Sequence, residues 1–88
     1  MASYSVFLVP AAQKQIEDLE KRDRLRVLEA VGALAEEPRP RGCEKLSTLE
    51  KYRIRVGTYR VVYTIDDAVV RVVVVRVGRR RDVYRRKG

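Results

Sequence analysis

The chain has 88 residues, with 20 Lys and Arg against 12 Asp and Glu, which gives a formal charge of +8 at neutral pH. This length predicts one domain, 1–88, and hydrophobic residues make up 45% of it, which is enough for a core and excludes wholesale disorder. There is no histidine and one cysteine. These counts exclude a histidine-based triad, a histidine metal site and a cysteine zinc cluster, so we expect neither a metal nor another cofactor.

The positive charge lies in the second half of the chain. Residues 1–38 carry 5 basic and 7 acidic side chains, whereas residues 39–63 carry 7 and 2 and residues 71–88 carry 8 and 1. A nucleic acid suits such a surface because each phosphate contact releases counterions, although an acidic protein or an anionic membrane would satisfy the same charge. We find no secretory signal and no apolar run long enough to span a bilayer, and therefore expect a cytoplasmic protein without a membrane partner.

A strand and two helices are predicted in the first half. Residues 3–9 begin with alternation and are rich in β-branched and aromatic side chains, which indicates a strand. Pro10 suits the first turn of a helix, and a second helix after a short charged break must end before Pro38. The first helix has an apolar stripe of Ala12, Ile16 and Leu19, and the second of Leu25, Leu28, Val31, Leu34 and Ala35. The two helices form a predicted hairpin.

A predicted loop over 38–49 leads into three predicted strands at 52–56, 59–65 and 69–77. Gly57 and Thr58 form a two-residue hairpin loop with glycine first, which is typical of a type II′ turn. The last strand is almost continuously apolar, which predicts an interior strand buried on both faces. The order of elements predicts an α+β fold, in which a helical hairpin covers one face of a mostly antiparallel sheet that ends in a three-stranded meander.

The two-residue loop fixes the register of the hairpin. It places Arg55 opposite Arg60 and Arg53 opposite Val62, so that the three arginines share one face of the sheet. The other face, suited to the helices, receives Tyr52, Ile54, Val56, Tyr59, Val61 and Tyr63. Like charges directly opposite one another are unfavourable in a sheet, whereas guanidinium groups bind phosphate oxygens in a bidentate manner. The cluster predicts an anion site, and a solvated polar face is the alternative.

The end of the chain adds a second basic group with one aromatic residue. Tyr84 is suited to stacking on a base or lying near a phosphate, and simple packing is its alternative. For most of the basic residues around it we expect only nonspecific charge. The candidate RNA-binding residues outside the arginine cluster are Lys45, Lys51, Arg79, Arg81, Arg85 and Arg86.

Several linked motifs resemble the RelE branch of the RelE/ParE toxin superfamily. They are YRIRVGTYRVVYTI followed by VVRVGRRRDVY, with VPAAQKQIEDL and a P-x-P-x-G-x-x-K-L loop before them. The resemblance implies a microbial-ribonuclease-like fold and a toxin of a type II toxin–antitoxin system. It also implies a ribosome-dependent endoribonuclease that cuts mRNA in the aminoacyl site without a metal, and a cognate antitoxin as partner. In that chemistry the ribose 2′-OH attacks the scissile phosphate.

The resemblance carries the family's site residues onto positions of this sequence. They fall on Arg53, Arg55, Arg60, Arg80 and Tyr84, with Arg79 and Arg81 as close alternatives to Arg80. Arg60 and Arg80 are suited to clamping the phosphate in the transition state. Arg53 and Arg55 stand where relatives often have lysines, and they are poor proton donors because arginine stays protonated. Tyr84 is then the candidate general base, with a purely orienting or stacking role as the alternative.

Two other functions fit the same sequence. The ParE branch poisons DNA gyrase, but it generally has a histidine-containing R-V-L-H-x-x-R-D stretch, where this chain has RVGRRRDVY. That difference favours the RelE branch. A nucleic-acid-binding module without catalysis would also use the basic face.

Overall fold

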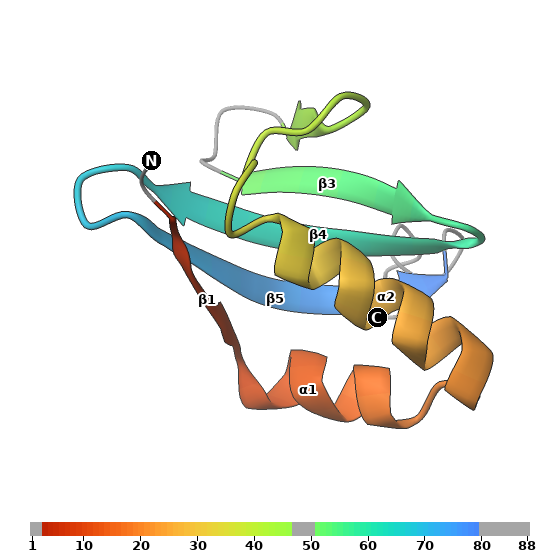
Figure 1. The fold of residues 1–88 in the computed structure, drawn as a ribbon. Helices are drawn as coiled ribbons and strands as arrows, with labels where there is room; N and C mark the ends of the chain where they lie inside the picture. Colours follow the sequence, from red (N-terminus) through yellow and green to blue (C-terminus); the bar gives the residue numbers. More distant parts are fainter. Residues whose placement is uncertain (1–2, 47–50, 80–88) are drawn as a thin grey trace.

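The computed structural model describes residues 3–46 and 51–79, which form one sheet and two helices (Figure 1). In chain order the elements are β1 Ser5–Leu8, α1 Pro10–Glu17, α2 Lys21–Ala33, β2 Glu44–Leu46, β3 Lys51–Val56, β4 Tyr59–Asp66 and β5 Arg71–Arg79. The sheet order is β1-β5-β4-β3-β2, with β1 parallel to β5 and the other neighbours antiparallel. The predicted α+β class is confirmed.

Both helices pack on the same face of the sheet, and the core lies between the two layers. Pro10 is the first residue of α1, as predicted, and Ala12 and Ile16 are buried beneath it. The apolar face predicted for α2 is partly wrong, because Leu25 is 56% and Leu28 is 41% exposed. The buried residues of this segment are Val27, Val31 and Leu34. Val31 and Leu34 belong to both the predicted and the buried set. Residues two apart in a helix point about 200° apart, so Leu25 cannot face the sheet together with the buried Val27.

The segment predicted as a loop over 38–49 contains a short strand. β2 pairs antiparallel with β3, with Glu44 opposite Arg53 and Leu46 opposite Lys51. Three residues are too few to show a period in the sequence, and the strand exists because the outer edge of β3 offers it hydrogen-bond partners. The predicted three-stranded meander therefore has four strands.

β5 is the predicted interior strand, between β1 and β4, but it is buried on one face only. Val72, Val74 and Val77 are in the core, whereas Val73 is half-buried because the helices cover only the opposite face. The pairing with β4 shifts register so that Val62 faces Arg76 and Tyr63 faces Val74. This bulge lets Val74 and Val77 both point toward the helices despite an odd separation.

At the end of the sheet away from the β3–β4 turn, a network of side-chain hydrogen bonds links several segments of the chain. The Arg39 guanidinium donates two hydrogen bonds to the Asp67 carboxylate, at 3.3 and 2.9 Å, and a third to the Tyr52 hydroxyl at 3.3 Å. The Tyr4 hydroxyl donates to Asp67 at 2.8 Å. The buried Tyr63 hydroxyl donates to the Pro38 carbonyl at 2.7 Å. These bonds tie the β4–β5 turn to the start of the chain and to the segment after α2.

No helix among the described residues is long and apolar enough to cross a membrane.

Candidate nucleic-acid interface

The β3–β4 hairpin has the predicted register. Arg55 lies opposite Arg60, and Arg53 lies opposite Val62. Gly57 has a φ of +64°, and Thr58 does not share a positive φ, which agrees with a type II′ turn. On the helix side of this hairpin the predicted core side chains are buried, with Val56 half-buried: Tyr52, Ile54, Tyr59, Val61 and Tyr63. The three arginines consequently point to the face of the sheet away from α1 and α2, which we call the open face.

The three arginines differ in their access to solvent. Arg55 is exposed, whereas the Arg53 side chain is 13% exposed and forms an ion pair with Glu44 of the neighbouring edge strand. Arg60 is only 2% exposed. The cluster is thus graded in depth and partly neutralised. The hairpin register alone does not predict this, because the sequence predicts a loop at Glu44.

Arg55 and Arg60 line one small cavity beside the β3–β4 turn. Its volume is about 170 Å³, and Gly57, Thr58 and Tyr59 complete its lining. Two guanidinium groups and the backbone of a tight turn make this a cavity for a compact anion, since both can donate hydrogen bonds to phosphate oxygens.

Two further arginines near the site were not predicted from the sequence. Arg76 is exposed and lies opposite Val62, which puts it on the open face. Strict alternation would place Arg71 and Arg76 on opposite faces, and the bulge in β5 brings them to the same one. Arg26 of α2 packs its guanidinium group against the turn, 3.5 Å from where a Cβ on Gly57 would lie. Nothing in the sequence except its basic side chain indicates that Arg26 lies beside this turn.

The remaining predicted site residues are divided between the two faces. Lys51 lies opposite Thr64 on the open face. Lys45 lies opposite Tyr52, and Arg79 lies opposite Tyr59 with its guanidinium carbon 6.0 Å from the ring centroid, so both belong to the helix side. The structure does not bring these two together with the arginine cluster. The other predicted positions lie outside the described residues: Arg80, Arg81, Tyr84, Arg85 and Arg86.

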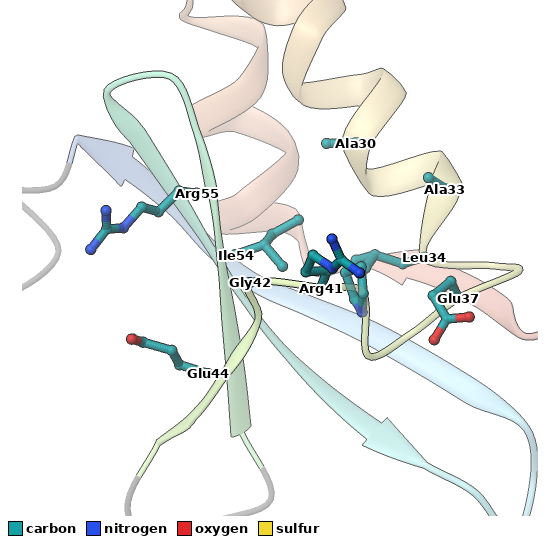
Figure 2. Close-up of a pocket in the computed structure, with 10 residues that line it drawn as sticks. Ala30, Ala33, Leu34, Glu37, Arg41, Gly42, Glu44, Ile54 and Arg55 are labelled. Carbon is teal, nitrogen blue, oxygen red and sulfur yellow. The ribbon is translucent and has the colours of Figure 1, made fainter.

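A larger cavity lies on the helix side, between the end of α2 and β3 (Figure 2). Its volume is about 560 Å³, and its apolar residues include Leu34 and Ile54. Its charged lining mixes signs: Glu37, Arg41, Glu44 and Arg55. Figure 2 shows Arg55 and Glu44 on the opposite side of β3 from the two small alanines of α2. Because both acidic and basic groups line this cavity, it is less suited to a nucleic acid than the arginine cluster of the open face.

Comparisons with known proteins agree with this fold. Residues 6–84 match the model of a family described as the ParE toxin of the type II toxin–antitoxin system, parDE. The chain is 38% identical over 88 residues to Toxin RelG of Mycobacterium tuberculosis, covering 94% of this chain and 98% of that protein.

Two solved structures extend the comparison. The toxin–antitoxin complex RelBE2 of Mycobacterium tuberculosis matches with a TM-score of 0.77 and 34% identity, covering 89% of this chain and 99% of that chain. The archaeal RelE–RelB complex of Pyrococcus horikoshii matches with a TM-score of 0.79 and 30% identity, covering 89% and 96%. The family model has the ParE name, whereas these relatives are named RelE or RelG. The chain belongs to the RelE/ParE superfamily of type II toxin–antitoxin toxins, in its RelE branch.

Proposed function

We propose that this toxin is a ribosome-dependent, metal-independent endoribonuclease that cuts mRNA in the aminoacyl site and so inhibits translation. The observation that carries the proposal is the directly opposed Arg55–Arg60 pair beside a cavity on the open face. Stability alone disfavours such a pair, and a phosphate between the two guanidinium groups would turn their repulsion into binding. Membership in the RelE branch, whose resemblance implies mRNA cleavage, supports RNA as the source of that phosphate.

The chemistry assigned to the site needs charge stabilisation more than proton transfer by the arginines. The ribose 2′-OH attacks the adjacent phosphorus, the bond to the 5′-oxygen breaks, and the products are a 2′,3′-cyclic phosphate and a 5′-OH end. Arg60 stabilises the charge that grows on the phosphoryl oxygens, and its burial strengthens that interaction because nearby water is scarce. Arg53 and Arg55 bind the strand, Arg80 joins the phosphate clamp, and Tyr84 acts as the general base.

We also propose a cognate antitoxin as partner, and cytoplasmic action on the ribosome. Solved relatives include complexes of RelE with RelB. An acidic or amphipathic antitoxin segment that covers the open face would neutralise the toxin by competing for its arginines. A co-purified partner that contacts only α1 and α2 would contradict this mode of neutralisation.

Primer extension on an mRNA held by stalled ribosomes tests the nuclease. The wild-type toxin is expected to give codon-phased cuts, and Arg60→Ala and Tyr84→Phe to abolish or strongly reduce them. Removing one donor from a preorganised oxyanion site typically costs about 100- to 1000-fold in rate. Arg22→Ala is the matched control, because Arg22 is an exposed arginine of α2 far from the open face.

Since Arg60 is buried, the thermal unfolding of each variant is measured in parallel, and Arg55→Ala repeats the test at an exposed position. If the wild type makes no cuts but inhibits the supercoiling activity of gyrase, the protein acts as a ParE toxin. Ribosome or RNA binding without cleavage would instead identify a binding module without catalysis.

A further inference from the structure

A second exposed feature lies on the open face, at the end opposite the β3–β4 turn. Phe7 of β1 is 52% exposed, while its neighbours Val6 and Leu8 pack against the core. Because successive side chains of a strand alternate between faces, the ring of Phe7 points to the open face. Its partner in the parallel pairing is Val73, which is half-buried on the same side.

Arg71 covers this ring without a carboxylate to hold it. Its guanidinium carbon is 5.5 Å from the ring centroid of Phe7. The opposite residue, Asp66, is turned into its own loop, where it accepts hydrogen bonds from the amides of Ala68 and Val69 at 3.0 and 3.4 Å. Within residues 3–46 and 51–79 no ion pair of Arg71 is found. Its charge is therefore available to a ligand.

The backbone is strained at the residue that positions Arg71. Val70 has a φ of +54°, the left-handed region that a β-branched side chain strongly disfavours, at a cost of roughly 1–3 kcal/mol. The Val70 carbonyl accepts a hydrogen bond from the Ser5 amide at 2.9 Å, which ties this residue to β1. Such strain is typical of functional positions, and here it lies between the exposed Val69 and Arg71.

The Phe7–Arg71 pair and the arginine cavity are ends of one surface. Thr64 joins the row of Phe7 and Val73 across the sheet, and Lys51 continues it onto β3. Phe7 lies four residues along β4 from Arg60, at ~3.3 Å each, and two strands across, at ~4.8 Å each. The backbone separation of Arg60 and Phe7 is therefore roughly 16 Å. A few nucleotides of an extended single strand span that distance.

We propose that Phe7 and Arg71 form a second RNA-binding site, where a base of the single strand stacks on the ring while Arg71 contacts the adjoining phosphate. The inference rests on the proposed function, because it places this base a few nucleotides from the phosphate bound by Arg55 and Arg60. Exposed aromatic rings beside arginines are the usual platform for unpaired bases. A protein segment is the competing occupant, and the uncompensated positive charge favours RNA.

Direct binding to the full chain tests the site without relying on cleavage. The probes are fluorescent 2′-O-methyl oligouridylates of increasing length, which cannot undergo 2′-OH attack, and the readout is anisotropy. Affinity of the wild type is expected to rise in a step once the RNA reaches Phe7. Phe7→Ala should remove that step, a loss of about fivefold or more in Kd, and Phe7→Trp should keep it. Arg71→Ala should reduce the slope of log Kd against log salt concentration by the amount expected for the loss of about one phosphate contact.

Controls separate this site from the cleavage pocket. Leu25→Ala removes an equally exposed apolar side chain from α2 and should leave binding unchanged. Because the chain has no tryptophan, Phe7→Trp also introduces a single tryptophan, whose fluorescence a stacked base should quench. Thermal unfolding checks that each variant is folded.

The outcomes distinguish the two proposals. If Phe7→Ala binds RNA of every length like the wild type while Arg55→Ala binds weakly, the second site is refuted and the proposed function stands. If Phe7→Ala loses the step but Arg55→Ala does not weaken binding, the stacking site stands and the cleavage pocket is refuted. No RNA binding by the wild type, or a Phe7→Ala defect confined to capture of the antitoxin, would overturn the second site.

Discussion

Arg60 keeps its positive charge in a place where water hardly reaches it. A guanidinium group stays protonated under all physiological conditions, so burial does not neutralise it as it can neutralise a lysine. Arg55, directly opposite, is exposed and contributes the same charge in a high-dielectric setting. We therefore expect Arg55 to act mainly in RNA capture and Arg60 mainly in the chemical step, which the separate measurements of binding and cleavage can resolve.

Replacing Val70 by glycine should stabilise the protein. Glycine adopts a positive φ without strain, which stabilises the folded state by roughly 1–3 kcal/mol. Its greater freedom in the unfolded chain destabilises the folded state by about 0.5–1 kcal/mol. The free energy of unfolding from urea titrations should rise by about 1 kcal/mol. Val69→Gly is the control, since Val69 is exposed and lacks a positive φ, and it should lower that free energy. A destabilised Val70→Gly would contradict strain at this turn.

Asp67 should make the stability of the protein depend on pH in acid. Hydrogen bonds from Arg39 and from Tyr4 hold the pKa of the Asp67 carboxyl below its usual value of 3.8. Because the folded-state pKa is lowered, the stabilisation is complete well above pH 3.8 and is lost as the pH falls through the folded value. Asp67→Asn should lower the unfolding temperature at neutral pH. The difference in unfolding temperature between this variant and the wild type should shrink toward pH 3.

The exposed carboxylate of Glu29 provides the comparison for that titration. Glu29→Gln should show no such convergence with the wild type in acid. A difference between Asp67→Asn and wild type that stays constant from neutral to acid pH would show that Asp67 contributes nothing through its charge.

At the scale of elements, α2 allows a test with one substitution at two depths. Leu34 is 1% exposed and Leu25 is 56% exposed. Leu34→Ala should lower the free energy of unfolding by about 2–5 kcal/mol, because it leaves a cavity beneath the helix, whereas Leu25→Ala should change it by less than about 0.5 kcal/mol. Urea unfolding measures both. Equal losses at the two positions would mean that Leu25 is as well packed as Leu34, which would contradict this orientation of the helix.

The elements also show what the sequence can predict. The hairpin register followed from Gly57 and Thr58 because a two-residue turn is a local constraint. The orientation of α2 followed only in part, since Val31 and Leu34 are buried as predicted, whereas tertiary packing buries Val27 in place of Leu25 and Leu28. β2 and the bulge in β5 depend on partners far along the chain, so Glu44 beside Arg53 and Arg76 on the open face had no sequence signal.

At the scale of the whole molecule, the two faces carry different charges. The open face gathers arginines, whereas a cavity of about 540 Å³ on the helix side is lined by three carboxylates, Asp18, Glu20 and Asp23, together with Arg79. The segmental charge of the sequence already indicated this division, because the helical first half is acidic and the strands of the second half are basic. Under the proposed function, this asymmetry orients an approaching RNA before contact, with the sheet toward it.

The parallel pairing of β1 with β5 determines when the sheet of this protein is complete. β5 lies between β1 and β4, so the first and last described strands must meet before the sheet is continuous. Contacts of such large sequence separation form late, after the local hairpins. A nascent chain that still lacks β5 has neither the row joining Phe7 to β4 nor the full open face. Under the proposed function, synthesis therefore gives an antitoxin already in the cell time to meet the toxin before its RNA surface is complete.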